Sequence, residues 1–111
     1  MTSTNETNDS DLEFDLEITK TSRRHSGGGT WVSGTLNGTH CFDALVFPEH
    51  ADNPEWEIGD SRISKLWLSH IKTKDTSYNW DRGLDIPAAN KKVQALVDFL
   101  CAGLAEHVYG E

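Results

Sequence analysis

The chain has few of the features that mark secreted, membrane-spanning or nucleic-acid-binding proteins. It contains two cysteines and three prolines, and no apolar run approaches the roughly 18 residues of a membrane span. Lysine and arginine number 10 against 18 acidic residues, a formal net charge of −8. Because phosphate backbones are bound by clustered cations, direct nucleic-acid binding is not expected. The N-terminal residues lack the cationic and apolar regions of a secretory signal, so we expect a cytoplasmic protein.

Motifs for metal binding and catalysis are also missing. Cys41 and Cys101 form no Cys-x-x-Cys pair, the histidines form no His-x-x-x-His pair, and we predict reduced thiols with no metal or cofactor. No nucleophile elbow or similar local motif is present. We therefore expect a protein that is not an enzyme, with a small catalytic site around Asp81, Arg82 and His70 as an alternative.

What is present predicts one α+β domain over residues 11–111, preceded by a polar tail at 1–10 that is predicted to be disordered. From residue 11, apolar and charged side chains alternate, which is typical of a strand with one buried and one anionic face. The expected buried face holds Leu12, Phe14, Leu16 and Ile18. The glycine-rich segment 21–29 is predicted to be a flexible loop, because it has no phosphate-loop spacing and no helix follows it.

Residues 30–47 predict a β-hairpin. Asn37-Gly38 favours a two-residue type I′ turn, because both positions tolerate positive φ. The corresponding register places Trp31 opposite Ala44. One face would then hold Trp31, Phe42, Ala44 and Val46, and the other Val32, Leu45 and Phe47.

Residues 62–71 and 77–86 predict a second hairpin around the turn-rich segment 73–76. Pairing across Lys74-Asp75 would place Trp67 opposite Arg82. Between the two hairpins, residues 48–60 contain two prolines, five acids and no lysine or arginine. They predict a solvated connection from which two apolar residues, Trp56 and Ile58, pack back onto the fold.

From Pro87 the apolar residues recur at three- and four-residue steps, which predicts a helix of roughly five turns. Pro87 suits its first turn, Asp85 is a candidate cap, and Gly110 stands where the helix would end. The predicted fold is an antiparallel sheet of about four to five strands, made of two hairpins and an N-terminal strand, packed by one C-terminal helix.

The second hairpin also carries the candidate binding residues. In the predicted register they share one face and could stack an extended peptide, a base or a sugar; they are Trp67, Tyr78, Trp80 and Arg82. The alternative is a core face, because Ile63, Ile71 and Leu84 fall on the same side. Arg82 has a structural alternative too, an ion pair with a flanking acid.

Two segments carry a resemblance: Arg62-Ile63-Ser64-Lys65-Leu66-Trp67, and Asn79-Trp80-Asp81-Arg82-Gly83-Leu84-Asp85. The order of these segments, between a tryptophan-containing hairpin and a C-terminal helix, resembles a family of small uncharacterised proteins carried on phages, plasmids and other mobile elements. Leu84 stands where that family usually has tryptophan. The resemblance implies the fold and a mobile-element origin, and it implies no activity, cofactor or catalytic residue.

We therefore expect a non-enzymatic binding or accessory protein of bacterial or mobile-element origin that acts through a protein–protein surface. Its partner would be another protein or a second copy of the chain, and no membrane is involved. A second hypothesis is an acidic protein that imitates nucleic acid and occupies the basic groove of a defence or DNA-processing protein.

Overall fold

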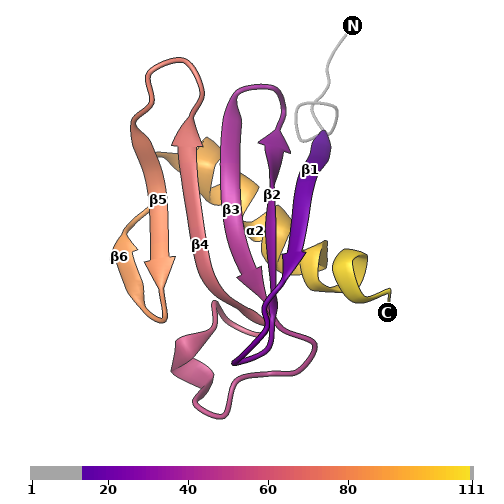
Figure 1. Cartoon of the computed structure of the whole chain (residues 1–111). Helices are drawn as coiled ribbons and strands as arrows, with labels where there is room; N and C mark the ends of the chain where they lie inside the picture. The colour runs from indigo at the N-terminus through magenta and orange to yellow at the C-terminus, as the bar shows by residue number, and fades with distance from the viewer. Residues whose placement is uncertain (1–13, 111) are drawn as a thin grey trace, which may run out of the picture.

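The computed structural model describes residues 14–110, in which a six-stranded antiparallel sheet is crossed on one side by a single α-helix (Figure 1). The strands lie side by side in chain order, so every neighbouring pair is joined by a hairpin or a longer antiparallel connection. The elements are β1 Leu16–Arg23, β2 Thr30–Leu36, β3 His40–Val46, the short helix η1 Pro54–Trp56, β4 Ile63–His70, β5 Thr76–Asp81, β6 Leu84–Ile86 and α2 Lys91–Tyr109. The predicted α+β class is confirmed, with β6 as an additional short strand.

Strand β1 follows the predicted alternation but lies further along the chain than expected. Phe14, Leu16 and Ile18 pack against the core, whereas the predicted tail and Leu12 lie outside the described residues. The strand continues to Arg23 and pairs there with the start of β2. The prediction of a loop beginning at residue 21 is therefore wrong. Backbone pairing with β2 continues through residues 21–23 although the side chains of this segment are polar, and the loop occupies residues 24–29.

The first hairpin turns where predicted but in a different register. Asn37 and Gly38 adopt φ of 55° and 67°, yet Leu36 pairs with His40 and the loop holds three residues rather than two. Trp31 consequently lies opposite Leu45 and not Ala44. A shift of one residue exchanges the two faces of a strand, so the prediction that Trp31 shares a face with Phe42, Ala44 and Val46 is wrong.

The second hairpin is also displaced from the predicted register. Trp67 pairs with Asn79 and Leu68 with Tyr78, whereas the expected partner of Trp67 was Arg82. The loop occupies residues 71–75, so its centre lies before the predicted turn at Lys74-Asp75. A bulge after Leu68 shifts the register of the two strands further. Trp67 therefore points to the opposite side of the sheet from Tyr78.

Helix α2 begins at Lys91, later than the predicted start at Pro87. Its cap is Asn90, whose Oδ1 accepts a hydrogen bond of 2.9 Å from the Val93 amide, and not Asp85. Gly110 ends the helix with a left-handed φ of 76°, as predicted. Within the described residues, no helix is long and apolar enough to cross a membrane.

The core lies between α2 and one face of the sheet. The helix contributes Val93, Leu96, Val97, Leu100, Leu104 and Ala105, and the sheet contributes Val32, Leu36, Phe42, Ala44, Val46, Ile63, Leu66, Leu68 and Tyr78. Gly34 lies on this side of β2, where a Cβ would come within 2.2 Å of the Glu17 carbonyl oxygen. A glycine is therefore needed for β1 to approach β2 at this point. In the described part of the chain no second helix covers the other face (Figure 1).

Candidate binding site on the open sheet face

The side of the sheet away from α2, which we call the open face, contains a hollow of about 510 Å³. Strands β1 to β5 all contribute, because alternate residues of each strand point away from the core. The side chains that line it from this side are Lys20, Ser22, Trp31, Ser33, Asp43, Lys65, Trp67, Asn79 and Asp81. The hollow thus combines aromatic, cationic and anionic groups on a surface without a helical cover.

Two tryptophans provide the apolar part of the open face. Trp31 on β2 is 36% exposed, and Trp67 on β4 is half-buried. The Trp67 Nε1 donates a hydrogen bond of 3.1 Å to Thr76 Oγ1 on β5, which fixes the indole against the neighbouring strand. Exposed tryptophans of this kind are enriched among residues that dominate protein interfaces.

Polar contacts fix the groups around the tryptophans. Lys65 Nζ lies 3.5 Å from Asp81 Oδ1, and Ser33 Oγ donates a hydrogen bond to Asp43. Because lysines and carboxylates alternate over this face, its charge is mixed. A phosphate backbone would meet Asp43 and Asp81 as repulsive groups, whereas a polypeptide with both signs of charge would find complementary partners.

The four predicted site residues do not form one cluster. Trp67 and Trp80 both line the hollow, but only Trp67 stands at a strand position that faces away from α2. Tyr78 lies in the core at 5% exposure, where burial, with Cys101 and Asp98 nearby, raises its pKa to about 12. Trp80 also lies on the helix side of β5, opposite Leu66. Arg82 lies in the turn between β5 and β6.

Tyr78 thus lies in the core, whereas Trp80 is half-buried against the core and also lines the hollow; Trp31, which the sequence prediction did not include among the candidate binding residues, lines the hollow as well. Its role follows only from the register of the first hairpin, which determines the face on which it lies. The burial of its neighbours Thr30 and Val32, which places Trp31 on the opposite side of β2, is seen only in the structure.

A second concavity, of about 700 Å³, lies at one end of the sheet. There the β1–β2 loop, the β3–β4 connection and the β5–β6 turn meet, as their positions in Figure 1 show. Arg24, Arg62 and Arg82 all line it, so we call it the arginine basin. It shares Lys65 with the open face.

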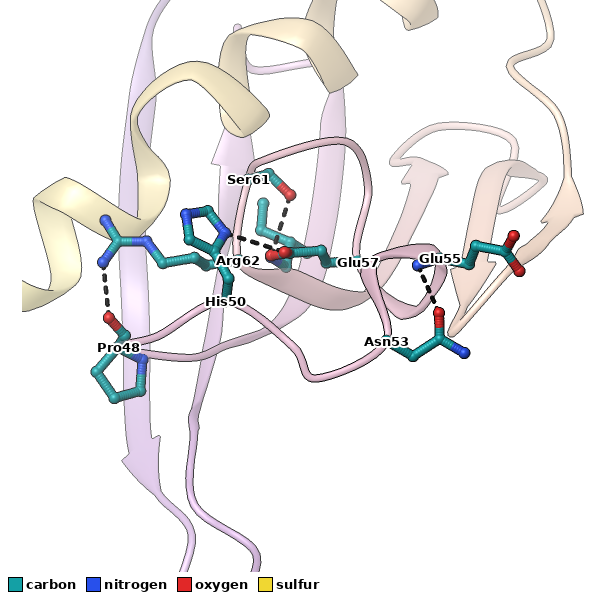
Figure 2. A network of polar contacts seen from close by, with 8 residues as sticks. Pro48, His50, Asn53, Glu55, Glu57, Ser61 and Arg62 are labelled. Atoms are coloured by element: carbon teal, nitrogen blue, oxygen red, sulfur yellow. Dashed lines mark hydrogen bonds and ion pairs between the residues drawn. The ribbon is translucent and has the colours of Figure 1, made fainter.

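The acidic connection 48–60 forms one wall of the arginine basin and is more ordered than a solvated loop. Figure 2 shows the His50 Nδ1 directed at Glu57 Oε2 at 2.9 Å, and the Arg62 Nη1 donating to the Pro48 carbonyl at 2.8 Å. Glu57 is only 4% exposed, and its Oε1 has no hydrogen-bond partner among the described residues. One of the five predicted surface acids is thus an interior group.

The two apolar residues of the same connection behave differently. Ile58 packs against the core as predicted. The Trp56 side chain is 44% exposed, and its backbone carbonyl accepts a hydrogen bond of 3.3 Å from Trp80 Nε1. The connection is therefore held to the fold through the backbone of Trp56, which leaves much of the indole at the rim of the arginine basin.

The groups of the alternative catalytic site lie apart. His70 ends β4, where its ring packs edge-on against His40 with centroids 4.9 Å apart. The Arg82 amide donates to the Ser64 carbonyl near the opposite end of β4. No group of three or more His, Cys, Asp or Glu side chains within residues 14–110 is arranged to hold a metal ion.

Fold and site together define a small α+β protein with one core face and one open, mixed-charge sheet face. A family model for a domain of unknown function, DUF7678, matches residues 30–105, which is more than half of the chain. The chain belongs to this family. No curated protein and no solved structure matches it.

Proposed function

We propose that this protein is a non-enzymatic binding module whose open face holds an extended segment of another protein. The observation that carries the proposal is the pair of tryptophans, Trp31 and Trp67, in a helix-free hollow bordered by lysines and carboxylates. Tryptophan side chains supply large contact area, and charges of both signs select the register of a polypeptide. The hollow crosses strands β1 to β5, and this length suits an extended chain.

The origin and location of the protein belong to the same proposal. The resemblance to proteins carried on phages and plasmids supports a mobile-element origin, with the bound protein a component of the host or of the element. Cys41 and Cys101 are free thiols, which supports a reducing compartment such as the cytoplasm.

A photo-crosslinking amino acid on the open face tests the proposal. Ser22 is an exposed position that lines the hollow, and Ala102 is an exposed position on α2 that serves as the matched control. In cells of the native host, the probe at Ser22 should yield one crosslinked protein in stoichiometric amount, and the probe at Ala102 should not. Absence of a product at Ser22, or the same product at both positions, would contradict the proposal.

The same experiment separates the other two hypotheses. A second copy of the chain as occupant would appear as a crosslinked homodimer, which light scattering would confirm. A nucleic-acid mimic would instead crosslink from the acidic connection, at an exposed position such as Asp52. Because Glu57 of that connection is buried, it cannot take part in an acidic surface that follows the phosphate repeat.

A further inference from the structure

We propose that the arginine basin binds a nucleotide-sized organic phosphate through Arg24, Arg62 and Arg82. The chain has four arginines in all, and these three line the basin although they come from segments far apart in sequence. Such convergence is notable in a protein with a net charge of −8. The site is separate from the open face, and the proposal does not depend on the function assigned to that face.

The charges of these arginines are not consumed by internal ion pairs. Within residues 14–110 the ion pairs are His50–Glu57 and Lys65–Asp81. Three acids also line the basin, the exposed Glu49 and Asp52 and the buried Glu57, yet none of them pairs with an arginine. Arg62 uses its Nη1 on the Pro48 carbonyl, and a guanidinium has five N–H donors. The three guanidinium groups therefore keep donors for an anion.

The backbone at two of the three arginines is strained. Arg62 and Arg82 adopt φ of 65° and 54°, a left-handed conformation that is unfavourable for an L-residue with a side chain. Strain of this kind persists where the surrounding structure imposes it, and it concentrates at binding sites. Here the Arg82 amide donates to the Ser64 carbonyl at 2.9 Å, so β4 holds the turn that carries Arg82.

The β1–β2 loop makes room for the Arg24 side chain. Gly27 and Gly28 line the basin with φ of 80° and 73°, a left-handed conformation that glycine adopts without strain. A Cβ at Gly27 would lie 2.7 Å from the Arg24 guanidinium. The Arg24 side chain therefore lies directly over the glycine loop.

Charge and size indicate an organic phosphate. A phosphate group carries between one and two negative charges near neutral pH and several acceptor oxygens, which planar guanidinium forks bind bidentately. A basin of about 700 Å³ is within the range that holds a nucleotide-sized molecule. The exposed indole of Trp56 at the rim provides a surface on which a planar ring can stack.

Calorimetric titration of the full chain with inorganic pyrophosphate and with ATP tests the proposal. Pyrophosphate reports on the phosphate contacts alone, and ATP adds the ring. Arg24→Gln and Arg82→Asn should each weaken binding of both probes about tenfold or more. Asparagine is chosen at position 82 because it tolerates positive φ. The matched control is Arg23→Gln, since Arg23 is exposed, adjacent to Arg24 and outside the basin.

Trp56→Ala should weaken binding of ATP and leave that of pyrophosphate unchanged. If Trp56→Ala changes neither, the phosphate site stands and the stacking contact is refuted. Absence of binding by the wild type at millimolar probe, or equal losses in Arg23→Gln and Arg24→Gln, would overturn the proposal. Should Arg82→Asn fail to fold, Arg24→Gln decides alone, because Arg24 is exposed and its change leaves the fold intact.

Discussion

The two faces of the sheet are built from the same strands and differ in almost every physical respect. Along β4, Leu66 and Leu68 point into the core at 1% and 0% exposure, whereas Lys65 and Trp67, which alternate with them, line the hollow of the open face. Because side chains alternate between the two faces, the residues of one face stabilise the fold and those of the other face are free to bind a partner. Neighbouring residues of one strand should therefore respond very differently to substitution.

The largest difference is expected on β3, between Phe42 and its neighbour Cys41. Phe42 is 1% exposed in the core, so Phe42→Ala should lower the free energy of unfolding by about 3–5 kcal/mol. Cys41 is half-buried on the open face, and Cys41→Ala should cost less than about 1 kcal/mol. Urea unfolding of both variants measures the difference. Similar losses would show that the faces are not energetically distinct.

A smaller contrast is expected in the reactivity of the two thiols. Cys101 is part of α2 and packs against the core, where burial raises its pKa to about 11 from the ordinary 9.0. At a given pH this lowers the thiolate population about a hundredfold. In a Cys41→Ala variant, Cys101 should thus react with a disulfide reagent about a hundredfold more slowly in the native protein than in urea.

The matched variant is Cys101→Ala, which leaves Cys41 as the reporter of the open face. Cys41 should show a smaller ratio between its rates in the unfolded and native states, because reagent reaches that face without unfolding. If Cys101 reacted equally fast in both states, the description of its surroundings as buried would be wrong.

The smallest effect concerns His40, at the end of the core near the loops of both hairpins. Burial, aided by the positive charges that His70 and Lys92 can carry, lowers the pKa of His40 below 6.5. As the pH falls, His40 therefore binds a proton in the unfolded chain before it does so in the folded protein. The free energy of unfolding is not reduced by this group above pH 6.5, and it declines as the pH falls below that value.

Thermal unfolding measured between pH 7.5 and 5.5 tests this sign. His40→Gln should flatten the dependence, and the exposed His107→Gln should keep the wild-type slope. An unchanged slope in His40→Gln would mean that another group controls the acid sensitivity.

Local sequence patterns predicted the first five strands and the α-helix of this fold, but not β6 or the short helix η1. Alternation identified Leu16 and Ile18 as inward-facing, Asn37-Gly38 located a turn, and the helical stripe around Leu96 and Leu100 predicted α2. Each of these features depends on side chains close together in the chain, where periodicity and turn preferences act directly.

The candidate sites depended on register and on distant contacts. The pairing of Trp67 with Asn79 is determined by the length of the loop and by a bulge after Leu68, and neither follows from residue type. An error in register exchanged the faces and placed Trp67 beside Tyr78 and Trp80. The arginine basin joins three segments only after the sheet has formed, so no local motif announces it.

The affinity of the crosslinked partner for a Trp31→Ala/Trp67→Ala double variant tests the division between the two faces most directly. The double variant should remain folded, lose about 1–2 kcal/mol of stability, and bind the partner at least about a hundredfold more weakly. Trp56→Ala, an exposed tryptophan outside the open face, should bind as the wild type does. A folded double variant that bound the partner with unchanged affinity would contradict the assignment of the open face as the binding surface.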